Sequence, residues 1–154
     1  MKKDGTVWVS GYNGYGTVGD GTTSSTSVFK QVQNIDDVIA ISAESNTVQM
    51  LKKDGTVWSI GLNSSGEFGN NTSSSSANSI PTKMCKIPNV MQIASGDNHV
   101  VLVTADGNAW SVGYNNYGQL GIASSADTMT VPQQIMDETG SNAIQGVKEA
   151  SCST

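Results

Sequence analysis

The string KKDGTVW occurs twice in this chain, at residues 2–8 and 52–58, and a looser copy, TADGNAW, spans 104–110. The Asp-Gly pairs inside these strings recur every 50 to 52 residues. A sequence that repeats itself at one spacing is built from a single supersecondary unit, copied along the chain. We therefore expect one repeat domain over residues 1–154, with units at about 1–46, 47–98 and 99–154.

A second pattern follows each copy in the same register. After the tryptophan and a glycine come the octets YNGYGTVG, LNSSGEFG and YNNYGQLG, at 12–19, 62–69 and 114–121. Each octet has Asn second, Gly fifth, an apolar residue seventh and Gly last. We assign the recurring positions to the scaffold of the unit. The structural repeat positions are Gly5, Trp8, Gly11, Gly55, Trp58, Gly61, Gly107, Trp110, Gly113 and His99.

Each period also contains four short apolar runs. In the middle of the chain these runs cover 47–52, 56–61, 81–85 and 90–95, and residues 38–43 and 147–152 match the run 90–95 in the other two units. Runs rich in Val, Ile and Trp between Gly, Asn, Asp and Ser clusters indicate strands, and Asp-Gly suits a tight hairpin turn. Four-stranded units at this period are typical of propeller blades. The predicted fold is all-β, a partial β-propeller of about three four-stranded antiparallel blades, open-ended.

The order of Asp-Gly, Trp, Gly and then Asn-x-x-Gly-x-Leu-Gly resembles the repeat of the regulator of chromosome condensation family. The third unit carries nearly the whole pattern, from Gly96 to Gly121, whereas the second has Glu44 and Thr47 where Gly and His would stand. The resemblance implies a propeller of about seven blades, a ring that three units do not close. Two functions associated with this family are exchange of guanine nucleotide on a small GTPase and contact with chromatin. Only scaffold residues match, so neither function carries over.

The two ends of the chain fall inside the repeat. Met1 stands at the strand position of Leu51 and Val103, and Thr154 aligns with Asp97. We therefore expect either a piece of a longer propeller or a short protein whose open ends meet other copies. Uncovered sheet edges favour association, and a head-to-tail contact closes into a ring or continues as a filament. In both cases we expect that the chain is not a stable lone monomer.

Composition narrows the choice of partner. The net charge is −5, and all eight basic residues are Lys, scattered along the chain, so we expect no nucleic-acid partner. No apolar run approaches the length of a membrane span, so we expect no membrane partner. Low charge, no Arg and many Ser and Thr favour an extracellular or cell-surface setting. Cys85 and Cys152 are expected to be unpaired thiols, because neither belongs to a metal-binding or disulfide spacing.

The sequence offers no catalytic, cofactor-binding or metal-binding group of residues. His99, the single histidine, has no nucleophile motif around it, and we expect it to form a hydrogen bond within its blade. The Asp-Gly carboxylates are explained by turn chemistry. The best surface candidates are side chains in the loops that follow the Trp-containing strand of each unit, since Tyr is favoured at interfaces. These candidate interaction residues are Tyr12, Tyr15, Tyr114 and Tyr117, with Leu62 in the second unit.

The predicted function is a non-enzymatic protein-binding or assembly module made of propeller-type repeats. Its partner would be a protein, either copies of this chain meeting through the open blade ends or an unknown protein, with no cofactor. One alternative is a structural subunit that joins head to tail into a ring or filament. Another is part of a larger exchange-factor-like regulator.

Overall fold

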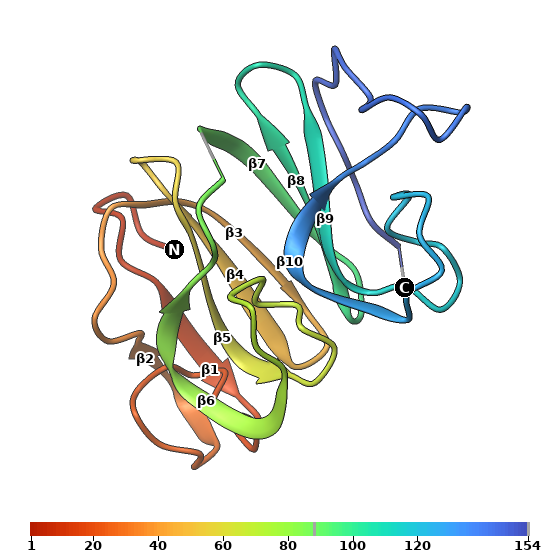
Figure 1. Cartoon of the computed structure of the whole chain (residues 1–154). Coiled ribbons are helices and arrows are strands. Elements are labelled where there is room, and N and C mark those ends of the chain that lie inside the picture. The colour runs from red at the N-terminus through yellow and green to blue at the C-terminus, as the bar shows by residue number, and fades with distance from the viewer. Residues whose placement is uncertain (88, 154) are drawn as a thin grey trace.

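The computed structural model describes residues 1–87 and 89–153, which form ten β-strands (Figure 1). This part of the chain contains no helix, and so none that is long and apolar enough to cross a membrane. The strands are β1 (Trp8–Gly11), β2 (Thr26–Gln31), β3 (Val38–Glu44), β4 (Thr47–Lys52), β5 (Val57–Asn63), β6 (Ser74–Lys83), β7 (Val90–Ser95), β8 (His99–Thr104), β9 (Ala109–Tyr114) and β10 (Thr128–Gln134).

These strands form three antiparallel sheets that stand side by side (Figure 1). The second sheet has the order β3-β4-β5-β6, the third has the order β7-β8-β9-β10, and the first consists of β1 and β2. The predicted all-β, open-ended partial propeller is confirmed. The first sheet differs from the other two because β1 and β2 correspond to the third and fourth strands of a blade, as β5 and β6 do in the second.

The sheets are offset by one strand from the sequence units. The second sheet takes its first strand, β3, from the unit 1–46, and the third sheet takes β7 from the unit 47–98. This offset links neighbouring units, because the strand that ends one unit begins the sheet of the next.

Residues 147–152, which we expected to form a strand, lie beside β7 without pairing into a sheet. The Gln92 side chain donates to the Ala150 carbonyl at 2.9 Å and accepts from the Ala150 amide at 3.0 Å. The Val147 amide also donates to the Gly107 carbonyl at 2.9 Å, as the Val38 amide does to the Gly5 carbonyl at 3.2 Å. The segment therefore occupies the place of a first blade strand, next to the third sheet.

The Asp-Gly hairpins show why the opening string is repeated. Gly55 has a φ of 77°, in the left-handed region that favours glycine. The Asp54 carboxylate accepts hydrogen bonds from the Thr56 amide at 3.0 Å and the Thr56 hydroxyl at 2.7 Å. The Trp58 indole in turn donates to that hydroxyl at 3.1 Å. Asp4, Thr6 and Trp8 form the same three bonds in the first unit.

The apolar cores lie between blades. One cluster, which contains Val7, Val32 and Ile60, joins the first and second sheets. The other contains Leu51, Leu102 and further side chains from the second and third sheets. Because each sheet buries side chains against its neighbour, burial of one blade's apolar surface requires the next blade.

The octet loops bring backbone against backbone at the blade junctions. A Cβ added to Gly66 would lie 2.9 Å from the carbonyl oxygen of Met129 and 2.8 Å from the Thr130 side chain, both on β10. The Asn71 amide, from the same loop, donates to the Thr130 carbonyl at 2.8 Å. Gly16 approaches β6 of the second blade in the same way. The glycine in the fifth octet position is therefore where one blade touches the outer strand of the next.

Candidate functional site

The candidate interaction residues lie at one end of the blades, which we call the loop end. It comprises the loops between the third and fourth strands of each sheet and the turns between the first and second strands. In residue numbers these segments are 12–25, 64–73, 115–127, 45–46 and 96–98. The Asp-Gly hairpins lie at the opposite end, which we call the turn end (Figure 1).

Each loop is folded around the buried Asn in the second position of its octet. The Asn13 side chain donates to the Thr22 carbonyl at 3.0 Å and accepts from the Val18 amide at 2.8 Å. Asn63 and Asn115 make the equivalent bonds in the second and third blades. One side-chain amide thus joins the two halves of the loop, by donating to one half and accepting from the other. The sequence shows that this Asn recurs, but its hydrogen-bonding role could be identified only from the folded loop.

Two tyrosine pairs project from these anchored loops. Tyr12 and Tyr15 lie edge to face with ring centroids 6.2 Å apart, and Tyr114 and Tyr117 do so at 6.1 Å. In each pair one ring is half-buried and the other is open to solvent, with Tyr12 69% and Tyr117 87% exposed. Edge-to-face packing holds each exposed ring against its partner. The exposed ring therefore loses little conformational entropy when another protein binds it.

The second blade interrupts this series. Leu62 is half-buried, and its amide donates to the Asn46 carbonyl at 2.8 Å, while Ser65 stands at the position of Tyr15 and Tyr117. In the part of the chain that the structure describes, no aromatic contact joins one tyrosine pair to the other. The structure therefore places the candidate residues at one end of the molecule, as two separate pairs.

The surroundings of the tyrosines are acidic. None of the eight lysines lies in the loop-end segments, whereas Asp20, Asp97 and Asp127 do. A hollow of about 360 Å³ beside Tyr12 is also lined by Glu44, the last residue of β3. A surface with carboxylates and no ammonium groups favours a neutral or basic partner.

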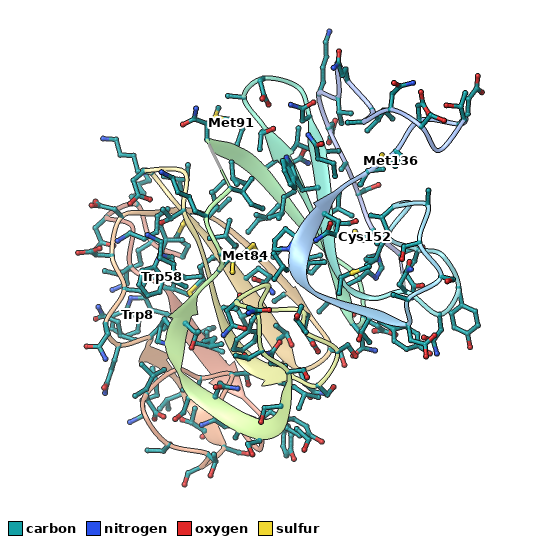
Figure 2. The ribbon with its side chains drawn as sticks, viewed as in Figure 1. Trp8, Trp58, Met84, Met91, Met136 and Cys152 are labelled. Carbon is teal, nitrogen blue, oxygen red and sulfur yellow. The ribbon has the colours of Figure 1, made fainter. Side chains whose placement is uncertain are left out.

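The structural repeat positions lie inside the blades. Gly5, Gly55 and Gly107 form the hairpin turns, and Trp8, Trp58 and Trp110 are half-buried (Trp8 and Trp58 are labelled in Figure 2). The third-strand glycines are Gly11, Gly61 and Gly113. These residues build the scaffold and do not gather at one surface.

His99 differs from the expectation drawn from the sequence. The structure shows no hydrogen bond from its imidazole to any described residue; the ring covers Gly96, where an added Cβ would lie 2.2 Å from the ring atom Cε1. Burial lowers the pKa of His99, and the nearby Asp97 opposes that shift. Within residues 1–87 and 89–153 no three His, Cys, Asp or Glu side chains meet in a group that would hold a metal ion. Cys85 and Cys152 are both free thiols.

Glu67 is a buried titratable residue that sequence reasoning missed. Its side chain is 2% exposed, with Oε2 accepting from the Ser65 amide at 2.7 Å and Oε1 lacking a partner among the described residues. Burial raises the pKa of this carboxyl above its ordinary value, against the smaller opposing effect of backbone donors. The equivalent residue in the third blade is Gln119, which accepts from the Tyr117 amide at 3.0 Å. In the sequence, the neutral Gln119 at this position was the one sign that a charge is not needed there.

Comparison with known proteins gives a consistent result. A family model described as the regulator of chromosome condensation (RCC1) repeat matches residues 54–103 and 106–154, and a second model with the same description matches 90–119. The human protein named Regulator of chromosome condensation is 28% identical over 124 residues, which cover 79% of this chain and 30% of that protein.

Solved structures agree with the family match. Human WBSCR16 superposes with a TM-score of 0.79 at 25% identity, over 98% of this chain and 38% of that one. Prp20p from Saccharomyces cerevisiae, which binds Gsp1p and histones, superposes with a TM-score of 0.74 at 25% identity, over 90% of this chain and 36% of that one. The chain thus spans about a third of the length of these proteins.

The expected extracellular or cell-surface setting is wrong. The relatives are a regulator of chromosome condensation and a histone-binding protein, and chromosomes and histones lie inside the cell. Low charge and abundant Ser and Thr misled the expectation, because here they reflect long polar loops between the third and fourth strands of each blade.

We predict that Glu67→Gln stabilises the protein at neutral and alkaline pH. The folded-state pKa of Glu67 is raised, so the wild type loses stability as pH rises from about 4.5 through that folded-state pKa. Removal of the buried charge should gain on the order of 1–3 kcal/mol at pH 8 and little at pH 4. Urea denaturation at both pH values measures the difference.

Glu138→Gln is the control, because it makes the same change of charge at an exposed residue. An equal gain from both variants, or a gain for Glu67→Gln that does not change with pH, would show that burial of the Glu67 carboxylate is not the cause.

Proposed function

Because this chain belongs to the regulator of chromosome condensation repeat family, we propose that it is a non-enzymatic protein-binding module that makes its contacts through the loop end. The observation that carries the proposal is the pair of exposed rings, Tyr12 and Tyr117, each packed on a half-buried tyrosine. Tyrosine is enriched among the residues that dominate binding energy, because it buries a large area at a small cost in entropy.

The charge of the loop end supports a partner segment that is basic or neutral. Asp20, Asp97 and Asp127 lie among the loop-end segments, and lysines do not. A Lys or Arg side chain of the partner would gain from these carboxylates and from the faces of the exposed tyrosine rings. Prp20p binds histones, which are basic proteins, and also binds Gsp1p. We propose the same two kinds of partner as the first to test for this chain.

We predict that Tyr15→Ser together with Tyr117→Ser weakens binding to purified core histones or to purified Gsp1p by about tenfold or more. Both substitutions place Ser where the second blade has Ser65, so the loop tolerates them. Each removes one ring of an edge-to-face pair. Titration followed by fluorescence anisotropy gives the dissociation constants.

The matched control is Phe29→Ser together with Met91→Ser, since both side chains are exposed and lie outside the loop end. The same loss from both double variants, or no binding to either protein by the wild type, would refute the proposed interface. Faster release of guanine nucleotide from a small GTPase that the chain binds would instead favour the exchange-factor-like alternative.

Assembly of copies is a second candidate function, and one observation favours it. Ile41 on β3 is 43% exposed, whereas Ile93, at the same repeat position on β7, is 8% exposed and belongs to the core between blades. Ile39 beside it is also exposed. Ile41 is thus open at a position that the next blade buries, and with Ile39 it forms an apolar strip that is suited to contact with another protein surface.

We predict that the 154-residue chain, produced alone, associates through this strip. Light scattering across about a hundredfold dilution should give a mass above that of one chain, rising with concentration. Ile39→Gln with Ile41→Gln should restore the mass of one chain, and Met91→Gln should not. A single-chain mass for the wild type at every concentration would exclude assembly through β3.

A further inference from the structure

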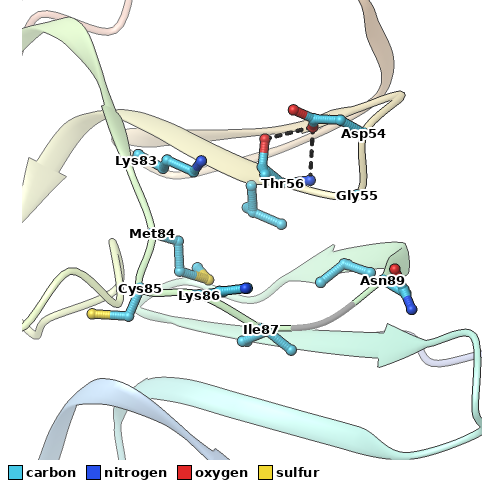
Figure 3. Close-up of a pocket in the computed structure, with 11 residues that line it drawn as sticks. Asp54, Gly55, Thr56, Lys83, Met84, Cys85, Lys86, Ile87 and Asn89 are labelled. Atoms are coloured by element: carbon cyan, nitrogen blue, oxygen red, sulfur yellow. Dashed lines mark hydrogen bonds between the residues drawn. The ribbon is translucent and has the colours of Figure 1, made fainter.

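A cavity of about 510 Å³ lies at the turn end, at the junction of the second and third blades (Figure 3). One side of the cavity is the β4–β5 hairpin with Asp54, Gly55 and Thr56, and the other side is formed by residues 83–87, 89 and 90 of the connection from β6 to β7. Three buried apolar side chains line it: Val57, Met84 and Val90. All three belong to the core between these blades, so the floor of the hollow is part of that core.

Two ammonium groups border this apolar hollow. Figure 3 shows the side chains of Lys83 and Lys86 directed toward the space between the hairpin and the connection. Both residues are exposed, and neither forms an ion pair with any residue that the structure describes. Lys83 is held loosely over Trp58, with its Nζ 5.9 Å from the ring centroid.

One carboxylate lies on the same rim, and its accepting capacity is partly used. Asp54 Oδ1 accepts from both the amide and the hydroxyl of Thr56 (Figure 3). Those two bonds, with smaller contributions from Lys52 and Lys83, lower the pKa of Asp54. Asp54 therefore remains charged, but its hydrogen bonds are made within its own hairpin turn. The lining of the cavity carries two positive charges against one negative charge.

The fold does not require the two lysines. Lys83, Gln31 and Gln134 occupy the same place, since each is paired with the repeated tryptophan of its blade. Lys86 is likewise replaced by Asn34 in the first unit and Asp137 in the third. Neutral or acidic residues satisfy the scaffold at these positions, so the basic pair is a property of this junction alone.

We propose that this cavity binds an acidic segment of a partner protein, with an apolar side chain in the hollow and flanking carboxylates on Lys83 and Lys86. Hydrophobic burial anchors the segment, and the two ammonium groups orient it. The volume matches pockets that hold a ligand of a few side chains. This surface is separate from the loop end, so the proposal goes beyond the protein-binding function proposed above.

The test uses fluorescein-labelled hexapeptides of the form Glu-Glu-X-X-Glu-Glu, with X as Leu, Met or Phe, and matched peptides in which Gln replaces Glu. Fluorescence anisotropy should show that an acidic peptide binds the full chain at least about tenfold more tightly than its Gln counterpart at low salt, with the preference shrinking as salt rises. Free glutamate and inorganic phosphate should compete poorly, because neither carries the apolar side chain.

Lys83→Gln with Lys86→Asn should abolish that preference, and it introduces only the residues found in the first unit. Lys3→Gln with Lys30→Gln makes the same change of charge on exposed lysines elsewhere and should leave the preference intact. Equal binding of acidic and neutral peptides, equal loss in both variants, or full competition by phosphate would overturn the proposal. Tyr15→Ser with Tyr117→Ser should leave peptide binding unchanged, so failure at one end of the molecule is distinguishable from failure at the other.

Discussion

The close approach of one blade's loop to the outer strand of the next is the constraint on which this structure depends. Gly66 lies against the backbone of Met129 and Thr130, and Gly16 lies against β6 in the same way. Such an approach is possible only without a side chain. It brings the sheets near enough to bury a shared core between them, since the two apolar clusters draw on neighbouring sheets. Each repeat therefore depends on its neighbour to bury its apolar surface.

The repeated residues explain how much of the fold was predictable. Asp-Gly, Trp and the octet glycines each perform a local task that depends on nearby sequence, so their spacing predicted hairpins, strands and blades. Residues 147–152 were predicted as a strand from the same pattern, but pairing requires a neighbour in the same sheet. Glu67 was missed because charged loop residues are usually exposed. Its burial depends on how the octet folds back on itself.

The candidate sites lie where the units differ from one another. Tyr117 corresponds to Ser65, Lys83 to Gln31 and Ile41 to Ile93, and in each pair the scaffold is the same while the exposure or chemistry changes. The tyrosines could be identified from sequence because they follow a recognisable octet. The lysine-bordered cavity could not, because it forms only when the β4–β5 hairpin meets the connection from β6 to β7. A common scaffold thus carries two distinct ends, one acidic and aromatic, the other with exposed lysines.

The central claim is that the fifth octet position requires glycine mainly because the next blade lies against it, and less because of backbone strain within the loop. Gly66 and Gly118 test this claim directly, because their φ values are nearly equal, 79° and 75°. An added Cβ would contact β10 at Gly66, whereas at Gly118 it would meet nothing within 4 Å. Urea denaturation of Gly66→Ala and Gly118→Ala compares them at matched backbone strain. We predict that Gly66→Ala is less stable than Gly118→Ala by about 1–3 kcal/mol, the cost of overpacking. Equal losses of stability would contradict the account.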